Sequence, residues 1–149
     1  MKNKIIIGMF MLITSLSAFA NGAENVNESV IKSFNKEFAG ARDVQWVASK
    51  DFVKATFTLN DQVTFAFYSP DGNLLAITRN IVSGQLPISL LAELKKNYNN
   101  YWIADLFEMA ANNDNTYYIT LENGDYKLVL KSNGTNSWDV FRKERKQAI

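Results

Sequence analysis

The sequence contains neither cysteine nor histidine. Without cysteine it has no disulfide, no thiolate nucleophile and no cysteine metal site. Without histidine it lacks the most frequent general base, the commonest metal ligand and the usual activator of a serine nucleophile. Only carboxylates, lysine and tyrosine are left for acid–base chemistry. We therefore expect a protein that is not an enzyme and that needs no cofactor and no metal.

The chain also lacks an excess of charge of either sign. Its 16 Lys and Arg residues face 15 Asp and Glu residues, which gives a formal net charge of +1. Such a balance does not indicate the strongly basic surface that is typical of nucleic-acid-binding proteins. The seven glycines stand singly, so there is no glycine-rich phosphate loop. We interpret the one basic segment, FRKERK near the C-terminus, as a solvated tail.

Long hydrophobic runs are absent except at the N-terminus, where Lys2 and Lys4 precede IIIGMFMLITSL. Ala18 and Ala20 then form an Ala-x-Ala pattern, which is typical of a cleavable secretory signal over residues 1–20. The apolar run is shorter than the roughly 18–20 residues of a spanning helix. We expect cleavage after Ala20 and a periplasmic or secreted mature chain without a membrane span. Its oligomeric state stays open.

The first element of the mature chain is a predicted helix. Asn27 is a suitable N-cap, and Val30, Phe34 and Phe38 follow at the spacing of one helix face. Gly40 ends the element, because a residue without a Cβ is favoured just past a helix. A short strand, DVQWVA, comes next.

Apolar residues then alternate with period two in FVKATFTL and VTFAFY, which predicts two strands. We expect a three-residue loop, residues 60–62, because it sets Leu59 opposite Val63 and Phe57 opposite Phe65. That register collects the apolar residues on one face of the sheet.

The next turn, SPDGN, contains Pro70 and Gly72 and predicts a tight turn with a bulge. It would set Phe67 opposite Leu75. A second helix opens at Pro87, and four more predicted strands follow. The turn at Asn123-Gly124 would set Leu121 opposite Tyr126, and after SNG we expect Leu128 opposite Trp138.

The order of elements repeats with a period near 60 residues. We therefore predict an α+β fold made of a tandem α-β-β-β-β repeat. Each four-stranded antiparallel meander would be covered by one helix. The repeats would span about residues 27–82 and 85–142 of a single domain, residues 21–149.

Three segments resemble a known family. They are VIKSFNKEFAGARDVQW, VTFAFYSPDGNLLAI and LPISLLAELKKNY, and the likeness covers nearly the whole mature chain. The layout is similar to that of PepSY-like exported bacterial proteins described as β-lactamase-inhibitor-like. The resemblance implies helices packed on antiparallel sheets, and related inhibitor folds present the uncovered sheet face to a protein partner. The resemblance implies no defined biochemical activity, and it assigns no inhibitor contact residue to any position of this sequence.

Carboxylates are the remaining candidates for catalysis or metal binding. Asp105 and Glu108 lie three residues apart in a predicted strand, which puts them on opposite faces. The loop around Asp114 lacks the spaced carboxylates of a calcium loop. We interpret Asp105 and Glu108 as surface residues and the segment around Asp114 as a plain hairpin connection.

The sheet face away from the helices is the predicted site for an unknown protein partner, because exposed apolar area there would mark an interface. The predicted partner-binding residues are Phe52, Tyr68, Leu74, Tyr118, Val129 and Phe141. A competing interpretation is that the two sheets or the tail cover these side chains, or that they lie scattered over the surface.

The alternative function is a periplasmic small-ligand carrier with a pocket between the two repeats. Trp46, Trp102 or Tyr101 would line that pocket. Trp46 and Trp102 are otherwise expected in the core.

Overall fold

The computed structural model describes residues 25–147 of the 149-residue chain. The elements are α2 (Glu28–Glu37), β1 (Arg42–Ala48), β2 (Val53–Leu59), β3 (Gln62–Tyr68), β4 (Leu74–Asn80), the 3₁₀ turn η2 (Ser83–Gln85), α3 (Ile88–Asn97), β5 (Trp102–Ala111), β6 (Asp114–Glu122), β7 (Tyr126–Asn133) and β8 (Ser137–Arg145). The predicted signal and its cleavage site lie outside the described residues. Between residues 25 and 147, no helix has the length and apolar character needed to cross a bilayer.

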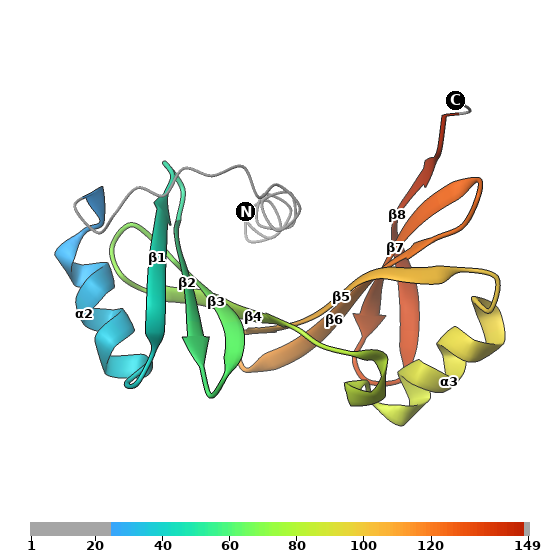
Figure 1. Ribbon diagram of the computed structural model, residues 1–149, viewed down its shortest axis with the longest axis horizontal. Coiled ribbons are helices and arrows are strands. Elements are labelled where there is room, and N and C mark those ends of the chain that lie inside the picture. Colours follow the sequence, from blue (N-terminus) through green and yellow to red (C-terminus); the bar gives the residue numbers. More distant parts are fainter. Residues whose placement is uncertain (1–24, 148–149) are drawn as a thin grey trace.

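All eight strands form one antiparallel sheet in the order β1-β2-β3-β4-β5-β6-β7-β8 (Figure 1). The predicted fold class is wrong on this point, because the strands do not form two separate meanders. β4 pairs with β5 from Ile77 opposite Ala110 to Asn80 opposite Phe107. This pairing satisfies backbone groups that two separate four-stranded sheets would leave open at their edges. The result is a single, mostly β architecture with two helices.

Both helices lie on the same face of the sheet, toward its opposite ends (Figure 1). Ile77 packs on the α2 side and pairs with Ala110. Leu106 lies four residues before Ala110 on the same strand, so it points to the same face, and there it joins the cluster under α3.

The helix α2 forms for the reasons seen in the sequence. The Asn27 side chain caps it by accepting a hydrogen bond from the Ser29 N–H at 3.1 Å. Phe34 then packs edge-on against Trp46 and Phe57, with ring centroids 5.1 and 4.9 Å apart. Trp46 is therefore a core residue, as predicted. Burying each such ring stabilises the fold by about 1.5–3 kcal/mol.

The helix α3 begins after Pro87 and buries Leu90 and Leu94. The Trp138 indole N–H of β8 donates to the Leu90 carbonyl at 3.0 Å, and the Trp138 backbone N–H donates to the Glu93 carboxylate at 3.1 Å. These two bonds fasten the last strand to the helix.

The predicted β2–β3 register is wrong by one residue. The loop contains only Asn60 and Asp61, both with positive φ, and Leu59 pairs with Gln62. A two-residue turn with two positive φ values matches the twist of the strands, and Asn and Asp tolerate that conformation. Phe57 therefore lies opposite Thr64.

This shift turns over every side chain of β3. Phe65 and Phe67 leave the α2 face, and Tyr68 takes their place beneath the helix. The assumption of one apolar face caused the error, because both faces of this sheet are apolar.

Three other predicted registers also change. A bulge sets Phe67 opposite Ala76, not Leu75, although Gly72 has the expected positive φ of 93°. Leu121 pairs with Leu128 and not with Tyr126, and this shift of two residues leaves the side chains of β7 on the predicted faces. Beyond SNG, Leu128 lies opposite Lys143.

Candidate functional site

A third apolar cluster lies on the sheet face opposite α2 and α3. It contains buried Phe52, Phe67, Ala76, Phe107, Met109 and Tyr118. We use the name aromatic face for the seven rings on this side of the sheet, which are Phe52, Phe65, Phe67, Trp102, Phe107, Tyr118 and Phe141. Four strands and the residue before β2 contribute them, so the face crosses the join between β4 and β5.

Strand register positions the central rings. Phe107 and Tyr118 are direct cross-strand partners and stack with centroids 5.2 Å apart. Phe141 meets Tyr118 edge-on at 5.8 Å, and Phe52 meets Phe67 at 5.9 Å. Such pairs contribute about 0.5–1.5 kcal/mol beyond their buried area, so the buried rings of Phe52, Phe67, Phe107 and Tyr118 form a rigid platform, with Phe141 at its edge.

Two lysines flank this platform. The Lys54 ammonium lies 4.9 Å from the centroid of the Phe65 ring, and the Lys131 ammonium lies 6.0 Å from that of Tyr118. Burial lowers the pKa of Lys54. Among the described residues neither lysine forms an ion pair, so their charge is not neutralised by a carboxylate within the fold.

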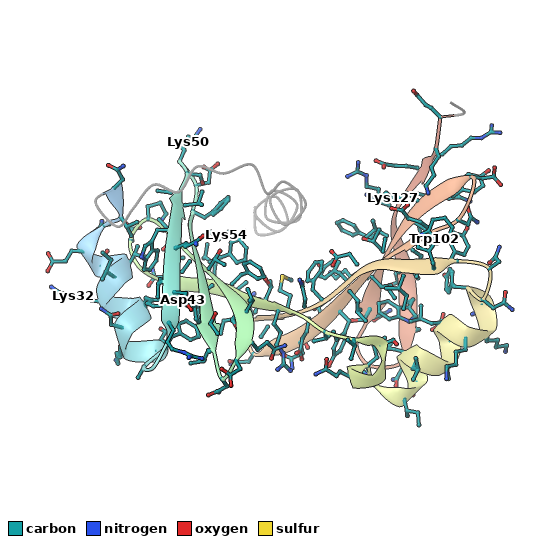
Figure 2. All side chains as sticks on the ribbon, viewed as in Figure 1. Lys32, Asp43, Lys50, Lys54, Trp102 and Lys127 are labelled. Atoms are coloured by element: carbon teal, nitrogen blue, oxygen red, sulfur yellow. The ribbon has the colours of Figure 1, made fainter. Side chains whose placement is uncertain are left out.

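The rim at β5 and β6 carries an accessible tryptophan. Trp102 is 54% exposed, and the Lys146 ammonium lies 4.8 Å from the centroid of its ring. Lys146 also pairs with Glu122 at 2.8 Å, and Lys127 approaches Glu122 at 3.9 Å. The Lys146 hydrogen bond lowers the pKa of Glu122. In Figure 2, Trp102 and Lys127 lie on the side of the last four strands that faces away from α3.

The six predicted site residues do not all lie together. Phe52, Tyr118 and Phe141 belong to the aromatic face. Val129 lies on the same side, because it pairs with Thr120 and alternates with Leu128 and Leu130 of the α3 cluster.

Tyr68 and Leu74 lie elsewhere. The expected position of Tyr68 away from the helix is wrong, because its side chain is fully buried beneath α2, with its hydroxyl 3.5 Å from Glu37. Leu74 is 37% exposed at the start of β4, opposite Tyr68.

Sequence reasoning missed four rings of the face. Phe65 and Phe67 were placed in the α2 core, and Trp102 was expected in the core but is the most exposed ring of the face. The signal that could have found Phe65 and Phe67 is the Asn60-Asp61 pair, which favours a two-residue turn. Phe107 can be placed on this face only when the β5–β6 register is known, and the sequence alone does not determine that register.

Asp105 and Glu108 do not come together as a carboxylate pair. Asp105 and Glu108 point to opposite faces, as predicted. Glu108 is held by Arg79 at 2.7 Å and accepts from Asn115 and Tyr117. Burial raises the pKa of Asp105. Within residues 25–147, no group of three acidic residues is placed to hold a metal ion.

Two surface cavities among the described residues each match the predicted pocket in one respect: the first lies between the two repeats, and the second contains Tyr101. One, of about 370 Å³, lies between the start of β4 and the β5–β6 turn and is lined partly by Leu74 and Asn112. The other, of about 280 Å³, lies at the C-terminal end of α3 and includes Tyr101. Trp46 and Trp102 line neither of them.

The chain matches no protein-family model and no curated protein. Its structure is similar to that of a DUF2874 family protein from Bacteroides ovatus, with a TM-score of 0.71 and 14% identity over 82% of this chain and 89% of that one. It is also similar to a protein from Bacteroides eggerthii that is assigned to the periplasm, with a TM-score of 0.70 and 14% identity over 80% and 88% of the two chains.

A third similar structure is a BLIP-like protein from Bacteroides fragilis, with a TM-score of 0.67 and 16% identity over 80% of this chain and 86% of that one. None of the three is described as PepSY-like, so that part of the resemblance stays a prediction. At these identities the likeness concerns the fold alone. The chain has the BLIP-like fold.

Proposed function

We propose that this protein is an exported, non-enzymatic binding module of the PepSY-like, β-lactamase-inhibitor-like kind. Its aromatic face binds a protein partner. The observation that carries the proposal is a sheet with two apolar faces, of which only one is used to hold the helices. The similar structures support it, since one is BLIP-like and one is assigned to the periplasm.

The aromatic face divides into a platform and a contact rim. Phe67 and Tyr118 are 0% and 2% exposed, so they position their neighbours. Trp102 and Phe141 are accessible, at 54% and 37%. Tryptophan is among the residues that most often dominate binding energy at interfaces, because its ring is large and rigid. We therefore assign the main partner contacts to Trp102 and Phe141.

The charge of the face indicates the chemistry of the partner. Lys54 and Lys131 lie over aromatic rings on either side of the join between β4 and β5, and no carboxylate among the described residues forms an ion pair with either lysine. A partner surface with apolar and acidic side chains would match this arrangement. Charge complementarity of this kind sets specificity and association rate more than affinity.

The experiment compares exported protein purified from cells that express the full chain with two variants. The first, Trp102→Ala with Phe141→Ala, removes the accessible rings of the rim. The control, Ile88→Ala, removes an apolar side chain from the helix side that is even more accessible, at 83% exposed. Partners captured from the exported fraction are purified, and their affinity for each variant is measured by calorimetry.

We expect the double variant to bind its partner at least about 30-fold more weakly, the effect of one interface hot spot. The control should bind like the wild type, and circular dichroism should show all three folded. Lys54→Gln should weaken binding more at low than at high salt. If the double variant and the control bind equally well, the aromatic face is not the interface.

A further inference from the structure

A cavity of about 280 Å³ lies on the helix side of the sheet, away from the aromatic face. Its floor and walls are continuous with the core under α3, because Leu94 and Leu121 belong to that core and also line the cavity. Ile103, which is 45% exposed, lines it from β5. The core of the second half is therefore open to solvent at this point.

The cavity is apolar inside and polar at a few places. Leu91 completes the aliphatic wall, and Tyr98 and Tyr101 meet edge-on with ring centroids 6.2 Å apart. Ser83 and Asn99 add neutral polar groups. A small number of polar groups around an apolar cavity is the usual composition of a small-molecule site.

Among the described residues that line the cavity, Lys95 alone carries a charge. Its neighbour Lys96 does not line it. The Glu93 carboxylate accepts a hydrogen bond from the Trp138 backbone N–H at 3.1 Å, and burial together with the Glu93 charge raises the pKa of Tyr98 in the cavity wall. The unpaired carbonyl groups at the C-terminal end of α3 carry about half of a negative charge, which disfavours an anion close to them. Lys95 is the charged group of the lining itself, so an anionic head is favoured where it contacts the Lys95 ammonium.

We propose that this cavity binds a single-chain amphiphile with an anionic head, of which a medium-chain alkyl carboxylate is the simplest example. The alkyl chain lies against Leu91, Leu94 and Ile103, and the carboxylate pairs with Lys95. The volume is roughly nine times that of a water molecule in the liquid, which suits a chain of about eight to ten carbon atoms. The site is separate from the proposed protein interface.

The test is calorimetric titration of the protein, purified from cells that express the full chain, with hexanoate, octanoate and decanoate below their micelle concentrations. Affinity should rise about fourfold for each added methylene, because each buries apolar area. Decyltrimethylammonium should bind more weakly than decanoate. Failure of decanoate to bind at millimolar concentrations would overturn the proposal, as would equal or tighter binding of the ammonium.

Variants separate this site from non-specific adsorption. Lys95→Met should weaken decanoate binding by about two- to fivefold, the range of an exposed ion pair, and leave decanol binding unchanged. Lys96→Met, one residue further along the helix, is the matched control and should behave like the wild type. If the two lysine variants lose affinity equally, Lys95 has no specific role and the assignment of the head group is wrong.

Ile103→Trp should fill the cavity and abolish measurable decanoate binding. Val140→Trp adds the same ring to a 60% exposed position of β8 that does not line the cavity, and it should have no effect. Unchanged binding in Ile103→Trp would overturn the site itself. None of these results depends on a protein partner, so this proposal and the proposed function can fail separately.

Discussion

Replacing Gly72 by alanine tests how closely α2 approaches the turn between β3 and β4. A Cβ at Gly72 would lie 2.9 Å from both the carbonyl carbon and the carbonyl oxygen of Ser29 in α2. These are backbone atoms, so a change of side-chain rotamer cannot relieve the contact. The turn is also held in place, because the Ser33 hydroxyl donates to the Gly72 carbonyl at 2.7 Å and the Gly72 N–H donates to the Ser69 carbonyl at 2.9 Å.

Two costs add at this position. Gly72 has φ of +93°, and alanine in the left-handed region costs about 1–2 kcal/mol. Forcing an extra carbon into a packed contact typically costs a further 1–3 kcal/mol or so. We therefore expect Gly72→Ala to lower the free energy of unfolding by about 2–5 kcal/mol, which is a large part of the stability of a small domain.

Gly40→Ala is the matched control. Gly40 has nearly the same φ, +88°, but a Cβ there meets nothing within 4 Å. Its cost should be the backbone part alone, about 1–2 kcal/mol. Urea unfolding of both variants, with equal slopes against denaturant, gives the difference directly. If the two variants lose the same free energy, α2 does not press against this turn and the reasoning is refuted.

Three further predictions test the core and one partly buried carboxyl group. Tyr68→Ala removes a fully buried ring and should lower the free energy of unfolding by about 3–5 kcal/mol. Tyr68→Phe loses only the 3.5 Å contact of the hydroxyl with Glu37 and should cost less than about 1 kcal/mol. If urea unfolding shows equal losses for the two variants, the ring is not part of the core. Trp138→Phe should cost about 1–3 kcal/mol, because it removes the indole hydrogen bond to the Leu90 carbonyl and part of a buried ring. Trp102→Phe should change thermal stability little. For Asp105, burial raises the pKa in the folded state, so its contribution to stability is present below the unfolded pKa and lost as pH rises through the folded one. Asp105→Asn should therefore be more stable than wild type at pH 7 and lose that advantage toward pH 3, and a difference that stays constant with pH would contradict the assignment.

The helices could be predicted from the sequence because their signals are local. An N-cap at Asn27, the spacing of Val30 and Phe34, and Pro87 before the second helix all act within a few residues. Structure and sequence agree on the order of the elements for the same reason. Local signals of this kind do not depend on what the rest of the chain does.

The sheet could not be predicted in full, because its register and its continuity depend on distant residues. The β2–β3 register was chosen to collect Phe57 and Phe65 on one face, and the structure separates them. The rule behind that choice holds only where one face of a sheet is solvated. A helix and two turns separate β4 from β5 in the sequence, and no residue pattern predicts that these two strands pair.

Strand β5 shows how the two proposed sites follow from one physical property, the alternation of side chains along a strand. Trp102 pairs with Glu122 on the aromatic face, and its neighbour Ile103 pairs with Leu121 on the helix side, where both line the cavity. A slip of one residue would exchange them, placing the tryptophan in the cavity and the isoleucine on the face. The bulge between Ile103 and Asp105 fixes this register just where the two sites lie back to back. Two adjacent residues can therefore serve two independent functions, because the sheet between them keeps their surroundings apart.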